Sequence, residues 1–124
     1  RVLALCENNE LLAFCAFDVQ DKHGGRVGYV LELIHEPGRG ADAQRLLQEA
    51  IAELAADGAE VVLAWCLEHS PNFAAYSKNG FFTLPERMRP IELHVGVRAL
   101  AAPAEANLAN RRNWYLSYVD SDTV

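Results

Sequence analysis

A short glycine-bearing segment between a strand pattern and a helix pattern has the composition of an anion-binding loop. It reads Pro37-Gly38-Arg39-Gly40-Ala41-Asp42-Ala43. Backbone N–H groups at a helix N-terminus lack partners within the helix, and the helix dipole places partial positive charge there. Glycine lets a phosphate approach the backbone closely, and Arg39 and Arg45 would add positive charge. The segment predicts either a phosphate-binding loop or an ordinary turn that leads into a helix.

A carboxylate in the strand before this loop is the first candidate for a general base. Glu32 interrupts the apolar run Val30–Ile34. Apolar surroundings favour the protonated form of a carboxyl group, which makes the carboxylate a better proton acceptor. Strand alternation could equally direct Glu32 toward solvent or toward a structural partner.

The histidines and cysteines offer weaker candidates. His35 and His69 each follow a predicted strand, where ligands gather in open α/β sheets, so they are second choices for a base or polar residues without catalytic duty. His94 lies within an alternating pattern, and Cys66 has no activating neighbour in the sequence. No cluster of Cys and His has metal-ligand spacing, so we predict no metal site.

A small mixed sheet has to position these groups. Three β-rich runs separated by turn clusters predict an antiparallel meander over residues 2–6, 11–17 and 27–35. The apolar spacing from Ala43 to Leu54 predicts an amphipathic helix that ends at Gly58. A nearly continuous apolar run over residues 61–67 then predicts a covered strand, which completes a parallel strand–helix–strand crossover.

The second half of the chain predicts further short elements. A short helix is expected within residues 71–79, closed by Gly80, and strands are expected over residues 81–83, 91–98 and 114–119. An Ala-rich loop or surface helix is expected over residues 99–110. The chain is therefore predicted to be one domain, residues 1–124, of the mixed α/β (α+β) class.

Three motifs, correct in order and spacing, resemble those of the GNAT superfamily of N-acetyltransferases. Tyr76-Ser77-Lys78-Asn79-Gly80-Phe81 resembles the family's Y-x-K-x-G-F signature. Upstream, Leu33-Ile34-His35-Glu36-Pro37 resembles L-x-V-x-P, and Ala43-Gln44-Arg45-Leu46-Leu47 resembles G/A-x-x-L-L. The resemblance covers residues 27–83 and implies a GNAT-like fold, a mixed sheet with antiparallel N-terminal strands and one parallel crossover.

The resemblance implies that acetyl-CoA is the co-substrate and that a primary amine of a small molecule or an amino sugar accepts the acetyl group. It places the coenzyme between the strands over residues 27–35 and 61–67, with a tyrosine at the position of Tyr76 as proton donor to the departing thiolate. Glu32 would then accept a proton from the amine. The residues implied in coenzyme binding are Leu33, Ile34 and His35 along the strand, Gly38, Arg39, Gly40, Ala41, Asp42 and Ala43 in the loop, and Asn72 on the pantetheine side.

The chain also departs from the family pattern. Aligned from the helix start, Gly38 takes the position of the family's Gln or Arg, which leaves Arg39 out of register by one. The family's first strand and two helices are lacking from this sequence. These departures favour the alternative of a non-catalytic GNAT module, an acyl-CoA sensor or a structural half of a two-lobed protein.

A dinucleotide-binding oxidoreductase fragment is a further alternative. Gly38, Gly40 and Ala43 fit G-x-G-x-x-G/A, and Glu68 stands at the end of the next predicted strand. Such a fold needs additional strand–helix units, for which the sequence offers little pattern.

Composition narrows the class of protein. The chain has 124 residues, a formal net charge of −6 and three cysteines in apolar runs, which indicates a cytoplasmic protein with reduced thiols. We expect neither nucleic-acid binding nor membrane insertion, because the charge is acidic and no apolar run approaches the ~20 residues that span a bilayer. The expected partners are the two substrates, with a second copy of the chain or an N-terminal remainder of a longer chain as further candidates.

Overall fold

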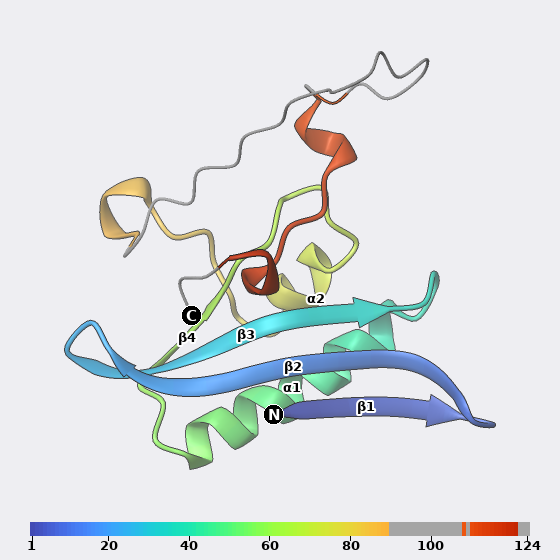
Figure 1. The fold of residues 1–124 in the computed structure, drawn as a ribbon, viewed down its shortest axis with the longest axis horizontal. Coiled ribbons are helices and arrows are strands. Elements are labelled where there is room, and N and C mark those ends of the chain that lie inside the picture. The colour runs from blue at the N-terminus through green and yellow to red at the C-terminus, as the bar shows by residue number, and fades with distance from the viewer. Residues whose placement is uncertain (90–107, 109, 122–124) are drawn as a thin grey trace.

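Four strands form a single mixed sheet in a computed structural model that describes residues 1–89, 108 and 110–121 (Figure 1). The sheet order is β1-β2-β3-β4, with antiparallel pairing except between β3 and β4, which are parallel. The strands are β1 (Val2–Glu7), β2 (Glu10–Lys22), β3 (Gly25–His35) and β4 (Val61–Ala64). The helices are α1 (Gly40–Ala56), α2 (Phe73–Lys78) and the short 3₁₀ helices η1 (Glu86–Met88), η2 (Arg111–Asn113) and η3 (Tyr118–Asp120). The mixed α/β class is therefore confirmed.

The predicted meander is confirmed at both of its turns. Asn8 and Asn9 join β1 to β2 with φ angles of 51° and 67°. Asparagine tolerates these left-handed conformations better than most residues do, and they match the twist of a two-residue hairpin. His23 and Gly24, with φ angles of 56° and 80°, make the equivalent turn between β2 and β3.

Helix α1 supplies the predicted crossover. It begins at Gly40, three residues before the first buried position, and its apolar stripe lies on one face of the sheet (Figure 1). Gly58, with a φ angle of 85°, follows the end of the helix and turns the chain back toward β4. The core between α1 and the sheet contains fully buried Phe17, Leu33 and Leu47.

Gly28 on β3 gives a test of this packing. A Cβ atom at residue 28 would lie 3.2 Å from both Leu54 methyl carbons and 3.3 Å from Ala59 Cβ. Gly28→Val is therefore expected to lower the free energy of unfolding by about 1–3 kcal/mol, because a closely packed core accepts extra volume poorly. Urea denaturation checks this, with Gly40→Ala as control because nothing lies within 4 Å of that position. Equal midpoints for the two variants would contradict the packing.

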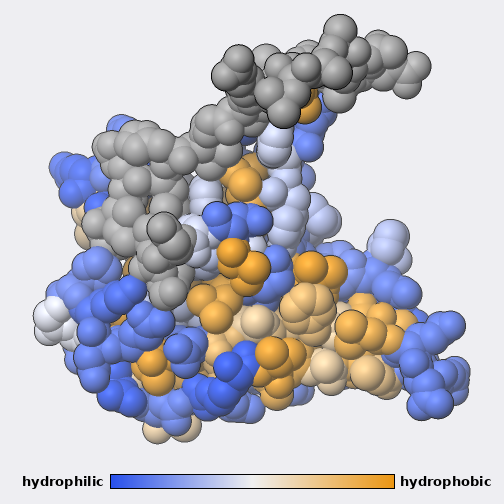
Figure 2. Space-filling view, in the orientation of Figure 1, coloured by the Kyte–Doolittle hydropathy of each residue, from blue (hydrophilic) through white to orange (hydrophobic). Residues whose placement is uncertain are grey.

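The sheet face opposite α1 is apolar and partly exposed. Val2 and Ile34 lie on this face, since they alternate with the core residues Leu3 and Leu33. Figure 2 shows hydrophobic residues gathered over these strands. Segment η3 packs beside β3 on the same side, in front of the sheet in Figure 1.

Three predicted strands differ from the structure. Strand β4 ends at Ala64 and not at Leu67, and its first residue, Val61, is 49% exposed, so β4 is not covered on both faces.

Residues 81–83 are not a strand, because the Phe81 amide donates to the Tyr76 carbonyl (3.1 Å) and ends α2. Residues 114–119 are not a strand either, since their polar groups bond side chains described below. The strand predicted over residues 91–98 and most of the segment 99–110 lie outside the described residues.

In the part of the chain that the structure describes, no helix has the length and apolar character needed to cross a bilayer.

Candidate functional site

Strands β3 and β4 pair only over a short stretch. The paired residues run from Val27 with Val61 to Val30 with Ala64, after which β4 ends and β3 continues to His35. A register shift against β2 at the same point leaves Leu31 as an extra residue between Val30 and Glu32. Such a bulge bends a strand and increases its twist. We call β3 residues 31–35 the open edge, because they have no β4 partner on that side.

The backbone of Leu33 points out of the open edge toward side chains. Its carbonyl accepts a hydrogen bond from Asn72 Nδ2, and the carbonyl oxygen lies 3.0 Å from Tyr115 Oη. Its amide donates to Glu32 Oε1 at 2.9 Å. Since N–H and C=O directions alternate along a strand, the backbone groups of His35 point to the same side.

Glu32 connects the C-terminal segment to the open edge through hydrogen bonds. Its Oε1 accepts a hydrogen bond from Tyr115 Oη, and its Oε2 accepts one from Ser117 Oγ at 2.8 Å. Ser117 is itself held by a capping box, in which its amide donates to Asp120 Oδ2 at 2.9 Å. The carboxylate therefore has hydrogen-bond partners on both oxygens.

Asn72 precedes α2 and is almost completely buried, with 3% of its surface exposed. Its amide nitrogen donates to Tyr115 Oη at 3.1 Å as well as to the Leu33 carbonyl. Its Oδ1 is buried and, among the described residues, has no partner. A buried amide oxygen without a donor is uncommon, which marks this position as one where an N–H or O–H group of a ligand would be stabilised.

Tyr76 lies on α2 beside this cluster and is 7% exposed. Its ring contacts Phe81 edge-to-face, with centroids 5.2 Å apart. Burial raises the pKa of the Tyr76 phenol above its ordinary value, and the negative charges that Cys66, Cys15, Tyr115 and Glu32 can carry add to the rise. In the part of the chain that is described, the Tyr76 hydroxyl makes no hydrogen bond, so it remains a protonated donor without a partner.

The loop between β3 and α1 presents unpaired amides. The amides of Gly38, Gly40 and Ala41 donate to no described residue, whereas those of Asp42 and Ala43 donate to the Arg39 carbonyl. Gly38 has a φ angle of 86°, and no atom lies within 4 Å of a Cβ built at either glycine. The loop is thus open to an anion on its glycine side.

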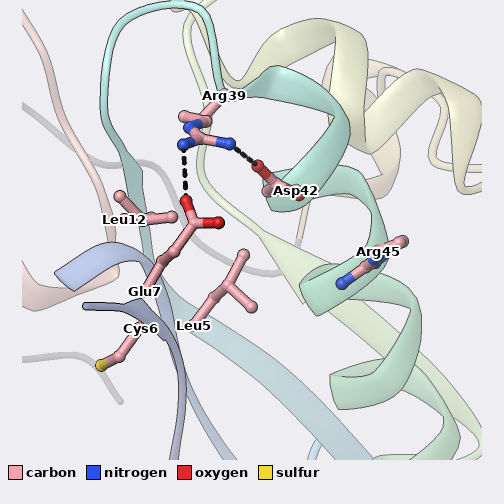
Figure 3. Close-up of a pocket in the computed structure, with 7 residues that line it drawn as sticks. All are labelled: Leu5, Cys6, Glu7, Leu12, Arg39, Asp42 and Arg45. Atoms are coloured by element: carbon pink, nitrogen blue, oxygen red, sulfur yellow. Dashed lines mark hydrogen bonds and ion pairs between the residues drawn. The ribbon is translucent and has the colours of Figure 1, made fainter. Parts of the chain in front are cut away.

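The Arg39 side chain turns away toward β1. Figure 3 shows its guanidinium between Glu7 and Asp42, at 3.1 Å and 3.5 Å from their carboxylate oxygens. These residues line a pocket of about 230 Å³ with Leu5, Cys6, Leu12 and Arg45. The Arg39 guanidinium is therefore already paired with two carboxylates.

The two histidine candidates have other contacts. His35 Nδ1 lies 2.8 Å from the Glu36 carbonyl, and its Nε2 is buried without a partner among the described residues. His69 Nε2 lies 2.9 Å from the Trp114 carbonyl, so that ring holds the C-terminal segment. Within residues 1–89, 108 and 110–121, no group of three or more Cys, His, Asp or Glu could hold a metal ion.

Most of the predicted site residues converge. Glu32, Leu33 and Asn72 meet at the open edge, and Tyr76 packs in the same core cluster as Leu33. The loop from Gly38 to Ala43 follows the same strand. Ile34 and Arg39 are exceptions, because the Ile34 side chain is 45% exposed on the apolar sheet face and the Arg39 side chain is paired with Glu7 beside β1. Sequence reasoning missed Tyr115 and Ser117, although the aromatic, acidic composition of residues 114–122 was a signal that this segment is unusual.

Comparison with known proteins shows the fold alone. No protein-family model matches the chain, and no curated protein matches it. The chain is similar in structure to TTHA1254 from Thermus thermophilus, with a TM-score of 0.55 for the wild-type crystal structure and 0.56 for that of a point mutant of the same protein. In both comparisons the sequence identity is 20%, and the matched region covers 82% of this chain and 72% of the TTHA1254 chain. The chain thus shares its fold with a bacterial protein.

Proposed function

We propose that the chain is a GNAT-type domain that binds acetyl-CoA and transfers its acetyl group to the primary amine of a small molecule or amino sugar. The observation that carries the proposal is the early end of the β3–β4 pairing, which leaves an open strand edge directly before a loop with free amides. This arrangement suits a ligand with an amide-bearing arm and a diphosphate, and coenzyme A has both.

The pantetheine arm would lie along the open edge. The backbone groups of His35 point out of this edge, and Asn72 Oδ1 is a buried acceptor that lacks a donor in the described part of the chain. An amide N–H of the arm would satisfy that oxygen, and satisfying a buried polar atom is worth about 1–3 kcal/mol. The Leu33 carbonyl would accept a hydrogen bond from the arm once the arm takes the place of Tyr115 Oη beside this oxygen.

The diphosphate would bind at the start of α1. Three donors, the amides of Gly38, Gly40 and Ala41, have no partner among the described residues. The positive end of the helix dipole favours an anion at the same place. Arg39 would contribute little charge while it is paired with Glu7 and Asp42.

The chemistry follows from the groups at the open edge. The amine attacks the thioester carbonyl, and the departing thiolate needs a proton. The raised pKa of Tyr76 keeps this residue protonated, and its unpartnered hydroxyl is the donor that we assign. Glu32 is the carboxylate at the open edge that receives the proton of the amine.

Turnover tests this proposal. Acetyl-CoA is mixed with glucosamine, lysine or phenylethylamine as acceptor, and released coenzyme A is measured through its free thiol. We expect release that depends on both protein and amine. Absence of acetyl-CoA binding would overturn the proposal.

Binding without turnover over this panel would favour the non-catalytic module. That second candidate is supported by one observation, namely that the Leu33 carbonyl already accepts from Asn72 Nδ2 and lies 3.0 Å from Tyr115 Oη.

Gly40→Leu tests the diphosphate site. A Cβ at residue 40 meets no protein atom, so the fold should be unaffected, but a side chain there would block close approach of a phosphate to the backbone. We expect the Kd for acetyl-CoA to rise about tenfold or more, since a hydrogen bond to a charged group contributes about 1.5–3 kcal/mol. Calorimetry measures this, with exposed Ala52→Leu as control. An unchanged Kd would show that the diphosphate does not bind at Gly40.

A further inference from the structure

The Tyr115 hydroxyl lies at the centre of the hydrogen bonds of the open edge. It donates to Glu32 Oε1, lies 3.0 Å from the Leu33 carbonyl oxygen, and accepts from Asn72 Nδ2 at 3.1 Å. The Tyr115 residue as a whole is 41% exposed, so this group can be reached from solvent.

The segment that carries Tyr115 is fixed at several points. Ser117 occupies the other oxygen of Glu32 and is held by its capping box with Asp120. The Tyr118 ring contacts the Tyr29 ring edge-to-face at 5.6 Å, and His69 contacts the Trp114 carbonyl. The hydroxyl of Tyr115 is therefore held in place by contacts before and after it in the chain.

This geometry limits how Glu32 can act as a base. Oε1 already accepts from the Leu33 amide and from Tyr115 Oη, so an N–H group of a neutral amine has to displace one of them to bond Oε1 directly. It can instead donate to the phenol oxygen, whose own proton already points at the carboxylate. We propose that Tyr115 is a further catalytic residue, which passes the proton of the acceptor amine to Glu32.

This inference rests on the proposed function, and its proton balance is simple. The amine nitrogen forms a bond to the carbonyl carbon, and the carbon–sulfur bond breaks. The nitrogen gives one proton to Tyr115 Oη as Tyr115 gives its own proton to Glu32, while Tyr76 protonates the thiolate. Glu32 is then protonated and Tyr76 is a tyrosinate. Transfer of one proton from Glu32 to Tyr76 through water restores both.

Tyr115 is suited to passing a proton and not to keeping a negative charge. Burial raises the pKa of its phenol, the hydrogen bond and charge of Glu32 raise it further, and the Asn72 amide offsets part of the rise. The residue is therefore neutral before and after each transfer. Phenylalanine at position 115 would keep the aromatic ring and remove the hydroxyl that makes the relay.

The kinetic test compares Tyr115→Phe and Glu32→Gln with wild type. With acetyl-CoA and the best acceptor among glucosamine, lysine and phenylethylamine, we expect kcat to fall about tenfold to a hundredfold in both variants, toward the lower end of general-base effects because water can partly replace the hydroxyl. The Kd for acetyl-CoA should stay within about twofold. Tyr118→Phe is the control, since it lies in the same segment and its described contacts are made by the ring.

A second measurement does not depend on turnover. NMR of ¹³Cζ-labelled tyrosine follows the ionisation of Tyr115 in wild type and in Glu32→Gln. Glutamine still accepts the hydrogen bond but carries no charge, so the phenol should ionise at lower pH in the variant than in wild type. Ionisation at the same pH in both proteins would show that the pair does not exist, and the relay would be wrong.

The outcomes separate the two proposals. If wild type turns over and Tyr115→Phe is equally active, the relay is overturned and the proposed function stands. If wild type does not bind acetyl-CoA, the proposed function is overturned and the relay with it. If Tyr115→Phe does not fold, as judged by thermal unfolding, Glu32→Gln decides: wild-type kcat in that variant overturns the relay.

Discussion

Tyr76→Phe is expected to lower kcat for acetyl transfer about a hundredfold to ten-thousandfold, the range of a general acid in enzymes. The phenol is buried beside the open edge, has a raised pKa and has no protein partner among the described residues. Phenylalanine preserves the contact with Phe81 and removes only the hydroxyl. Steady-state kinetics measures kcat, and calorimetry should show an unchanged Kd for acetyl-CoA.

Tyr29→Phe is the matched control for this substitution. Tyr29 is also buried, and its hydroxyl has no partner among the described residues, but it lies opposite Leu63 in the paired part of β3 and packs against Tyr118. Its loss should leave kcat unchanged. If Tyr76→Phe and Tyr29→Phe have the same kcat as wild type, Tyr76 is not the proton donor.

Cys15 is expected to be about a thousandfold less reactive toward iodoacetamide in the folded protein than in the unfolded chain. Burial raises the pKa of its thiol from 9.0 to about 12, and the Glu32 charge adds to the rise. Only the thiolate reacts, and a shift of about three pH units reduces its fraction about a thousandfold at neutral pH. Lack of access in the core lowers the rate further. Peptide mapping by mass spectrometry gives the rate for each cysteine.

Exposed Cys6 is the internal control for Cys15. The same pKa shift predicts the pH dependence of stability. Because the folded state holds the Cys15 proton more tightly, its contribution is complete below about pH 9 and is lost as pH rises toward about 12, by about 1.4 kcal/mol per pH unit. Equal alkylation rates for Cys15 and Cys6 in the native protein would contradict the packing of β2 against α1.

Local sequence signals predicted the first half of the fold well. Paired asparagines specify the β1–β2 turn, and the apolar spacing after Ala43 specifies α1. These signals act over a few residues, so they can be recognised without the partner elements. The end of β4 could not be recognised in this way, because Trp65 and Cys66 have strand-forming composition, yet the β3–β4 pairing ends at Ala64, where β3 has its bulge.

The segment after residue 113 shows the limit of composition. Residues 114–119 are aromatic and β-branched, which favours a strand, yet Tyr115 and Ser117 hydrogen-bond a carboxylate more than eighty positions earlier in the chain. Nothing within the segment specifies such a distant partner. The loop from Gly38 to Ala43 was recognisable as a candidate anion site, whereas the pairing of Arg39 with Glu7 depends on how β1 meets α1.

Calorimetric titration with acetyl-CoA tests the central claim most directly. A protein with an open strand edge and free amides at a helix start should release or absorb heat with one-site stoichiometry, and bound coenzyme should raise the Tm, because a ligand that binds only the native state stabilises it. NADH should give neither effect. No heat and no change of Tm at millimolar acetyl-CoA, or the same response to NADH, would contradict the proposal.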